Sequence, residues 1–451
     1  MPRALLIQPW IHDFAAYDLW VRPLGLLRLG GFLRSHGVEV SLLDCLDSNS
    51  PALHGARIKR LPTGRGAFYQ EEIPKPSPLG WFPRRYKRYG IPPSLFLEAL
   101  RSQPPPDVIL MGSGMTYWYP GVQETIYHCR MVFPDVPVVL GGIYATILPE
   151  HALEHSGADM VITGGNWSEI KAQLGSVLPL GPFCSSQTPM PAWDLVRGST
   201  SVCVKSSEGC PFRCSYCASH LLAPCYTARD PHEVAKEIVE ATRLLGTEDV
   251  AFYDDALLWQ AASHLLPILE SVRSQITNPL RFHCPNGLHA RFIDQKLARE
   301  MRIHGFSTLR LGLESSRSSF HERMGPKVSS SEFEAAVRCL LEAGYAPGDI
   351  GVYVMAGLPG QSVEEVEETL NYVLSLGLRP HLAEYSPIPG TDLWEEAVAQ
   401  SSLPISQEPL FHNNTLLPCR WERFPYEGFL ELKARLHRAL QGRASAQKRE
   451  T

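Results

Sequence analysis

Three cysteines on one short segment are the residues of this chain best suited to chemistry. Cys210, Cys214 and Cys217 form a Cys-x3-Cys-x2-Cys pattern. Three thiolates on one loop can hold three irons of a cubane iron–sulfur cluster and leave the fourth iron without a protein ligand. That open iron can bind the amino and carboxylate groups of a small molecule. The spacing therefore predicts a cluster with a chemical role.

Zinc binding and chance clustering in a core loop are the alternatives for the same cysteines. A structural zinc site needs four ligands, normally in two separated pairs. Cys225 is the nearby fourth candidate, and the chain has no second Cys-x2-Cys. The chain has eleven cysteines, and an odd, dispersed set argues against a disulfide framework. We expect the other eight to be packing residues: Cys45, Cys129, Cys184, Cys203, Cys225, Cys284, Cys339 and Cys419.

Composition places the chain among ordinary globular proteins. It has 451 residues, 44% apolar and 20% charged, which suggests two or three domains. A net charge of −5 gives no support to whole-surface binding of nucleic acid or membrane. We find no apolar run of about 18 residues, and the first apolar stretch stops at Pro9, too early for a secretory signal. We therefore expect a cytoplasmic protein without a membrane span.

The cysteines directly follow the first strand of an alternating strand–helix series. Apolar runs and helical periodicity predict six strands with intervening helices, at 201–205, 250–253, 281–284, 308–313, 351–356 and 382–385. Ser362 and Glu365 form a capping box that starts one of the helices. Six such units predict a partial (β/α)6 barrel over 201–395, with its site at the carboxyl ends of the strands.

An earlier α/β series occupies residues 1–175. Strands are predicted at 4–8, 38–43, 108–111, 137–140 and 160–163, with helices between them. This pattern is typical of an open, doubly wound parallel sheet, whose ligand crevice lies beyond the carboxyl ends of the strands. Residues 46–106, rich in Pro, Gly and Arg, interrupt it as a lid, a binding excursion or a surface decoration.

Two segments complete the predicted organisation. The proline-rich residues 176–200 form a linker. Residues 396–451 form a small helical tail, in which Phe429 and Leu432 belong to one apolar stripe.

The cysteine segment resembles the signature of the radical S-adenosylmethionine (radical SAM) enzymes, Cys-x3-Cys-x-aromatic-Cys, with Tyr216 as the aromatic residue. Four later strand ends also resemble elements of this family, in its order: 253–255, 310–316, 354–360 and 385–391. The resemblance covers about 201–395.

The resemblance implies a mechanism. A reduced 4Fe-4S cluster on Cys210, Cys214 and Cys217 would pass one electron to S-adenosylmethionine (SAM), giving methionine and a 5′-deoxyadenosyl radical that abstracts a substrate hydrogen atom. An external electron donor such as flavodoxin or ferredoxin would supply the electron. The protein would orient the reactants and exclude water and oxygen.

The resemblance also assigns cofactor contacts. Tyr216 would lie against the adenine, or simply pack beside the cluster. Glu314 and Ser315 would hydrogen-bond SAM, or form a rim ion pair or helix cap. Asp254 or Asp255 would bind SAM or substrate, or cap the next helix.

The N-terminal domain resembles that of the cobalamin-binding radical SAM subfamily, through residues 23–29 and the strand–Gly-Gly–loop at 137–146. Cobalamin contacts are expected at Ser113, Gly114, Gly141 and Gly142, since small residues at strand ends allow a close approach. Alternatively, these glycines only make tight turns. The Asp-x-His-x-x-Gly motif of many cobalamin domains is absent, so a histidine ligand from that motif is not supported.

The leading hypothesis is a cobalamin-dependent radical SAM enzyme that methylates a carbon of a small-molecule or peptide substrate. One alternative is a radical SAM enzyme without cobalamin that rearranges or modifies RNA or a small molecule. Another is a non-catalytic iron–sulfur protein. We find no added basic RNA-binding module and do not expect a nucleic-acid partner.

Overall fold

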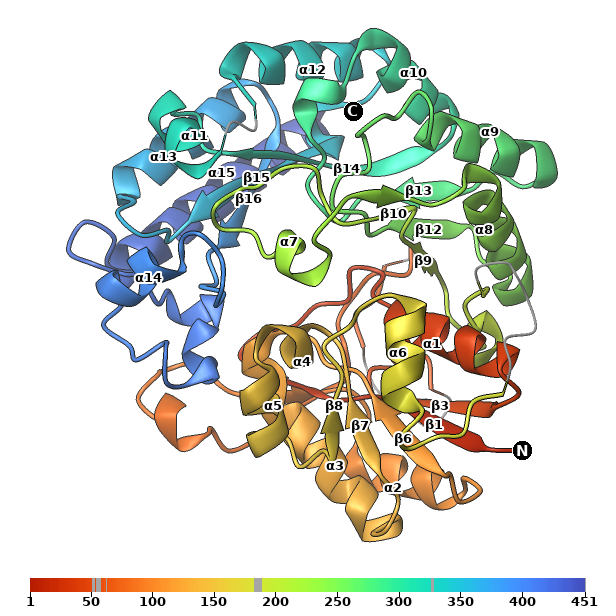
Figure 1. Ribbon diagram of the computed structural model, residues 1–451. Helices are drawn as coiled ribbons and strands as arrows, with labels where there is room; N and C mark the ends of the chain where they lie inside the picture. The colour runs from red at the N-terminus through yellow and green to blue at the C-terminus, as the bar shows by residue number, and fades with distance from the viewer. Residues whose placement is uncertain (51–52, 54–57, 62, 182–188, 326–327, 451) are drawn as a thin grey trace. The chain divides into compact units, whose positions relative to one another are not determined.

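The computed structural model describes residues 1–50, 53, 58–61, 63–181, 189–325 and 328–450 (Figure 1). Cys184, part of the predicted linker and part of the 46–106 segment lie outside the described residues. The chain divides into two compact units. One comprises Met1–Val204, Leu221–Ala223 and Lys236–Val250, and the other comprises Lys205–His220, Pro224–Ala235 and Ala251–Thr451. Within the described residues, no helix is both long and apolar enough to cross a membrane.

A five-stranded parallel sheet forms the centre of the first unit, in the order β3-β1-β6-β7-β8 (Figure 1). The strands are β1 (Arg3–Gln8), β3 (Glu39–Asp44), β6 (Val108–Met111), β7 (Val138–Leu140) and β8 (Met160–Val161). The chain goes from β1 to β3 on one side and returns to β6 on the other. The strand order therefore reverses beside β1, the place where such sheets bind ligands. The predicted doubly wound sheet is confirmed.

Helices pack on both faces of this sheet. They are α1 (Leu24–Ser35), α2 (Pro93–Arg101), α3 (Tyr119–Val132), α4 (Ile143–Ile147), α5 (Pro149–His155) and α6 (Trp167–Leu174). Side chains of β1 alternate between two cores, because Leu5 packs with Phe96 and Val122 whereas Leu6 packs with Leu33. Every residue from Ala4 to Ile7 is buried, which explains the continuous apolar run of this strand.

The 46–106 segment carries regular structure among its described residues. β4 (Gln70–Glu72) and β5 (Lys87–Tyr89) pair antiparallel with each other, and β5 pairs with β2 (Ile11–Asp13). These three-residue strands are polar or charged and lack the alternation that marks a strand in sequence. Helix α2 is the crossover that the parallel connection from β3 to β6 requires.

Six strands form the second sheet, in the order β16-β15-β14-β13-β12-β9 (Figure 1). They are β9 (Val202–Val204), β12 (Asp249–Phe252), β13 (Arg281–His283), β14 (Phe306–Glu314), β15 (Ile350–Ala356) and β16 (Arg379–Glu384). Strands that are consecutive in this series lie side by side in the sheet, and β13 to β16 pair in parallel. This is the predicted partial barrel.

The helices of the series alternate with these strands. They are α8 (Pro231–Leu245), α9 (Leu265–Gln275), α10 (Gln295–Ile303), α12 (Ser330–Glu342) and α13 (Val363–Ser375), with the short α11 (Ser318–Met324) and α14 (Trp394–Gln400) besides. The predicted capping box is present, since the Ser362 side chain accepts from the Glu365 amide and Glu365 bonds back to the Ser362 amide.

The C-terminal tail ends in a long helix, α15 (Tyr426–Glu450). Phe429 and Leu432 are buried, as the apolar stripe predicts. On its polar side, the Lys433 ammonium lies 2.7 Å from the Glu384 carboxylate, so this helix is tied to the end of β16. The basic side of the helix thus takes part in ion pairs.

Candidate active site

A small antiparallel ribbon closes the cysteine loop. β10 (Ser207–Glu208) pairs with β11 (Thr227–Ala228), directly before and after the loop that holds the three cysteines. Gly209 begins the loop at a φ of +71°, a backbone conformation that favours glycine. The cysteines are therefore held on a loop whose two ends are fixed to each other, after the first strand of the barrel.

The three thiols share one environment. Cys210, Cys214 and Cys217 are reduced thiols and partly exposed, and the Cys217 amide donates to the Cys214 carbonyl at 2.9 Å. Burial, with the charges of the other two thiolates, raises the pKa of Cys210 to about 11. A positively charged metal centre reverses this effect, because coordination removes the thiol proton.

The described residues contain no group of three His, Cys, Asp or Glu side chains arranged around a single metal ion. A cubane cluster is larger than one ion and holds its thiolates apart, so three accessible thiols on one loop suit a cluster. Cys203 and Cys284 are fully buried, and burial raises the pKa of Cys203 to about 12. Both match the expected packing cysteines, whereas Cys225 is exposed, so that prediction is wrong for Cys225.

Asp254 contacts the strand that leads into the cysteine loop. The carboxylate is 3% exposed, and it accepts hydrogen bonds from the amides and hydroxyls of Ser206 and Ser207, at 2.7 to 3.0 Å. The Asn286 side chain donates to the carbonyls of Tyr253 and Asp254. These contacts fix the backbone at Ser206 and Ser207, directly before the cysteine loop. Cofactor binding by Asp254 stays a prediction.

Asp255 points to a different set of groups. Its carboxylate lies 3.8 Å from the Lys205 ammonium, which in turn contacts Glu208 at 3.0 Å. Burial raises the pKa of Asp255, opposed by Lys205 and by a hydrogen bond from Ser219. The two neighbouring aspartates therefore have separate partners.

Tyr216 and Glu314 come together although 98 residues separate them in the chain. Burial, the charge of Glu314 and a hydrogen bond to Cys214 together raise the pKa of Tyr216 well above its ordinary value. Glu314 ends β14 at a φ of +66°, rare for a residue other than glycine, and the β14–β15 register shifts beside it. Strained residues of this kind cluster at functional sites.

Ser315 is buried directly after Glu314. Its hydroxyl accepts from the Arg317 amide at 3.2 Å, and its carbonyl contacts the His321 ring at 2.8 Å. These contacts lie in the turn before α11, whose N-cap is Arg317, so Ser315 does not cap this helix. SAM binding by Ser315 stays a prediction. His289 packs against Phe212 of the cysteine loop, with ring centroids 4.4 Å apart.

The four predicted cobalamin residues lie together at the ends of β6 and β7. The Ser113 hydroxyl donates to the Gly141 carbonyl at 2.6 Å, and the Ile143 amide donates to the Ser113 carbonyl at 3.0 Å. A Cβ on Gly142 would lie 2.4 Å from the Ser113 carbonyl oxygen, so glycine is required there. A Cβ on Gly141 would have its nearest neighbour at 3.8 Å, which leaves open space for a ligand to approach.

Gly114 serves a different purpose from Gly141. A Cβ there would meet the Trp118 ring at 2.7 Å, and the Trp118 indole donates to the Asp13 carboxylate at 2.7 Å. The space over Gly114 is thus filled by an aromatic side chain.

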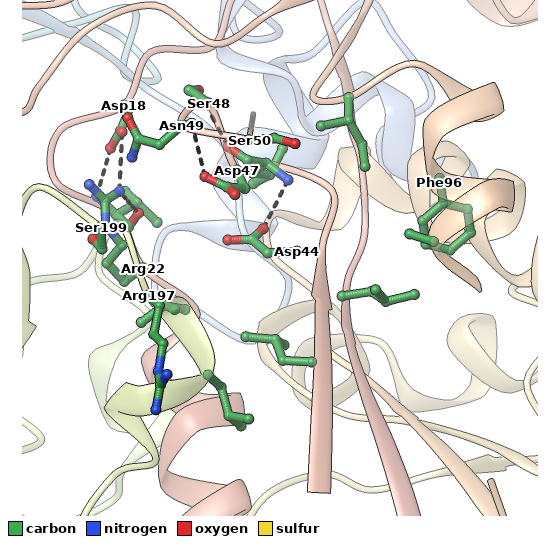
Figure 2. Close-up of a pocket in the computed structure, with 18 of the residues that line it drawn as sticks. Asp18, Arg22, Asp44, Asp47, Ser48, Asn49, Ser50, Phe96, Arg197 and Ser199 are labelled. Atoms are coloured by element: carbon green, nitrogen blue, oxygen red, sulfur yellow. Dashed lines mark hydrogen bonds and ion pairs between the residues drawn. The ribbon is translucent and has the colours of Figure 1, made fainter. Parts of the chain in front are cut away.

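A polar pocket of about 210 Å³ lies at the carboxyl end of β3 (Figure 2). Asp44 and Asp47 enter it from one side, and Arg22 forms the other wall. Burial raises the pKa of Asp44 to about 7. Sequence reasoning missed this pocket, although a polar residue at the carboxyl end of a parallel strand is the available signal.

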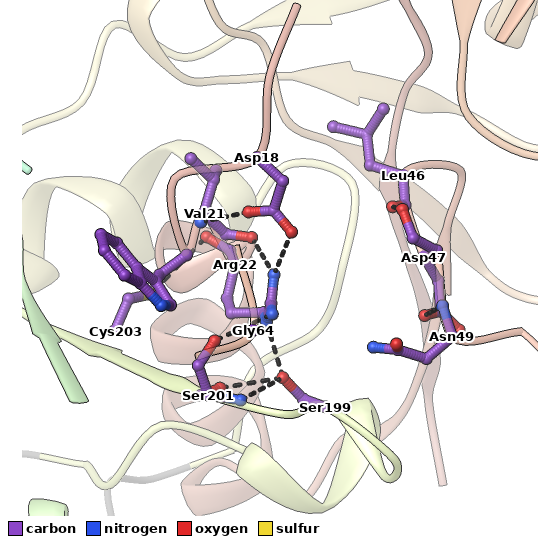
Figure 3. Close-up of polar contacts among 12 residues, drawn as sticks. Asp18, Val21, Arg22, Leu46, Asp47, Asn49, Gly64, Ser199, Ser201 and Cys203 are labelled. Carbon is purple, nitrogen blue, oxygen red and sulfur yellow. Dashed lines mark hydrogen bonds and ion pairs between the residues drawn. The ribbon is translucent and has the colours of Figure 1, made fainter. Parts of the chain in front are cut away.

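Arg22 makes several of the polar contacts beside this pocket (Figure 3). Its guanidinium donates to the Asp18 carboxylate at 3.2 Å and to the hydroxyls of Ser199 and Ser201 at 2.6 and 2.8 Å. Arg60 binds the same Asp18 carboxylate at 2.7 Å. Asp18 is almost fully buried, so these pairs compensate its charge.

Comparison with known proteins identifies a family for part of the chain. Residues 204–373 match the model of the Radical SAM superfamily. This segment of the chain, from the end of β9 into α13, is similar to radical SAM proteins. An uncharacterized methyltransferase of Pyrococcus horikoshii is 24% identical over 64% of this chain and 66% of its own length. The anaerobic magnesium-protoporphyrin IX monomethyl ester cyclase of Cereibacter sphaeroides is also 24% identical, over 61% of this chain and 50% of its own length. The chain therefore matches less than two thirds of either relative.

Two solved radical SAM structures share the fold over most of the chain. TsrM from Kitasatospora setae, a methyltransferase solved with tryptophan and a SAM analogue, has a TM-score of 0.62 at 17% identity and covers 89% of this chain and 76% of its own. The cobalamin-dependent enzyme OxsB has a TM-score of 0.56 at 12% identity, over 97% of this chain and 62% of its own. The chain thus shares its fold with these two enzymes.

Proposed function

We propose that this protein is a cobalamin-dependent radical SAM enzyme that cleaves SAM reductively and methylates a carbon of a small-molecule or peptide substrate. The observation that carries the proposal is the loop with three accessible thiols, closed by a ribbon, with Tyr216 and Glu314 beside it. TsrM is a methyltransferase and OxsB is cobalamin-dependent, which supports methylation and the second cofactor.

Cys210, Cys214 and Cys217 would hold a 4Fe-4S cluster, and their donor chemistry fits it, because thiolates are the usual ligands of such clusters. When bound, the cluster supplies one-electron reduction of SAM. Tyr216 and Glu314 would position SAM. The Tyr216 ring is partly buried beside Cys214, and the buried Glu314 carboxylate can accept a hydrogen bond.

The proposed cobalamin site is the strand end at Gly141, where the one atom of the described residues within 4 Å of an added Cβ is the Ile162 carbonyl oxygen, at 3.8 Å. Ser113 holds this turn through its bond to the Gly141 carbonyl. Bound cobalamin would supply the methyl group. An external reductant such as flavodoxin or ferredoxin would reduce the cluster, and we place the reaction in the cytoplasm, where thiol ligands stay reduced.

The test is anaerobic reconstitution with iron, sulfide, SAM and cobalamin. Cys214→Ala is expected to abolish iron binding and 5′-deoxyadenosine formation, whereas the matched control Cys225→Ala, an exposed cysteine outside the triplet, retains both. Visible absorption of bound corrin measures the second cofactor, and mass analysis of products detects the added methyl group. Cluster and SAM cleavage that survive in Cys214→Ala would refute the assignment. Cleavage without bound corrin would favour the cobalamin-free alternative.

A further inference from the structure

Ser219 lies directly against the third cysteine of the loop. It begins the short helix α7 (Ser219–Leu222), two residues after Cys217. Its hydroxyl oxygen is 3.2 Å from the Cys217 sulfur, and its amide donates to the same sulfur at 3.5 Å. A cysteine that ligates iron is a thiolate and carries no hydrogen, so Ser219 must be the donor in both contacts once a cluster is bound.

The Ser219 hydroxyl has a competing acceptor. It also hydrogen-bonds Asp255, whose carboxylate is paired with Lys205 at 3.8 Å. A hydroxyl has one hydrogen, so it can donate to the sulfur or to the carboxylate but not to both. Lys205 partly neutralises Asp255 and so favours donation to the sulfur.

We propose that Ser219 sets the reduction potential of the cluster by donating to the Cys217 sulfur, and that Asp255 opposes it by competing for the hydroxyl hydrogen. The inference rests on the proposed function, because it requires a cluster on Cys217. Hydrogen bonds to cluster sulfurs and nearby charge are established determinants of cluster potential. Reduction adds negative charge to the sulfurs, so a donor stabilises the reduced cluster and raises its potential, while a carboxylate has the opposite effect.

Ser219 and Asp255 are positioning residues in this scheme, since they act through the ligand Cys217. Ser215 provides a matched control on the same loop. It also neighbours a cysteine ligand, but its hydroxyl donates to the Met324 sulfur at 3.1 Å.

The experiment is a redox titration of the reconstituted full chain, followed by electron paramagnetic resonance, with iron content measured for every variant. Ser219→Ala is expected to shift the midpoint to more negative potential and Asp255→Asn to more positive potential. Ser219→Thr, which keeps the hydroxyl, and Ser215→Ala are expected to stay near the wild-type value. In the double variant, the Asp255→Asn shift is expected to shrink, because the hydroxyl is gone.

Opposite shifts at full iron content support the proposal, since a merely structural role would not change sign between the two variants. If Ser219→Ala fails to load iron, Ser219→Thr and Asp255→Asn carry the same test. A wild-type cluster with an unchanged midpoint in Ser219→Ala and Asp255→Asn would overturn the tuning role alone. A wild-type chain that binds no cluster would overturn this inference together with the proposed function.

Discussion

Gly142 and Gly141 form a natural pair of test positions, because neighbouring glycines have opposite surroundings. Gly142 has φ +97° and ψ −166°, a region that is essentially restricted to glycine and costs other residues about 1–3 kcal/mol. An added Cβ would also lie 2.4 Å from a backbone oxygen of Ser113. Relieving that clash would weaken the hydrogen bond from the Ile143 amide to Ser113, worth about 1 kcal/mol.

These contributions predict that Gly142→Ala lowers the free energy of unfolding by about 3 kcal/mol. For a unit of this size, the thermal midpoint should fall by roughly 6–12 °C. Gly141→Ala should leave the midpoint unchanged, since its nearest neighbour would be 3.8 Å away. The same methyl would enter the space proposed for cobalamin, so Gly141→Ala should weaken cobalamin binding.

The assay combines thermal unfolding, followed by circular dichroism, with a cobalamin titration followed by visible absorption. Gly142→Ala as stable as Gly141→Ala would refute the steric reasoning. Full cobalamin affinity in Gly141→Ala would instead refute the location of the cobalamin site.

Three further variants test other parts of the structure. Burial raises the pKa of Asp44 from 3.8 to about 7; the unfolded chain therefore loses this proton first, and stability should fall as pH rises from about 4 to 7. Asp44→Asn should remove that loss and gain on the order of 4 kcal/mol at pH 8 but little at pH 4, measured by thermal unfolding at both pH values. Asp254→Asn places an amide donor against the donors of Ser206 and Ser207. It should lower the free energy of unfolding by on the order of 3 kcal/mol and reduce iron loading. Unchanged iron content would contradict the role of Asp254 in fixing the cysteine loop. Ser362→Ala should cost about 1 kcal/mol in chemical denaturation, and an unchanged midpoint would show that the cap contributes nothing.

The alternation of strands and helices in both units was predictable because the strands are buried on both faces and read as apolar runs, as β1 does. The cysteine loop was predictable because its chemistry depends on local spacing. The β2-β5-β4 sheet was not, since its strands are short and charged and pair over long sequence distances.

The contacts of the site residues could not be predicted from the sequence. Asp254 follows a buried strand, but its binding to Ser206 and Ser207 joins residues almost 50 positions apart. No sequence pattern reports the positive φ of Glu314, because that conformation is imposed by the end of β14. Proximity of Tyr216 to Glu314 likewise depends on tertiary packing.

The strictly sequential order of the second sheet bears on how this part of the chain folds. Within this sheet, each strand from β12 to β16 lies beside the sheet strand made before it, whereas β10 and β11 form their own ribbon. Each step therefore closes the loop of one strand–helix unit. As the chain leaves the ribosome, the sheet can grow one strand at a time. In the first sheet, by contrast, β1 lies between β3 and β6. The edge of β1 that pairs with β6 therefore stays unpaired until the residues from 108 onward have been synthesised. The segment between them, with the β2-β5-β4 sheet, emerges while that edge is still unpaired.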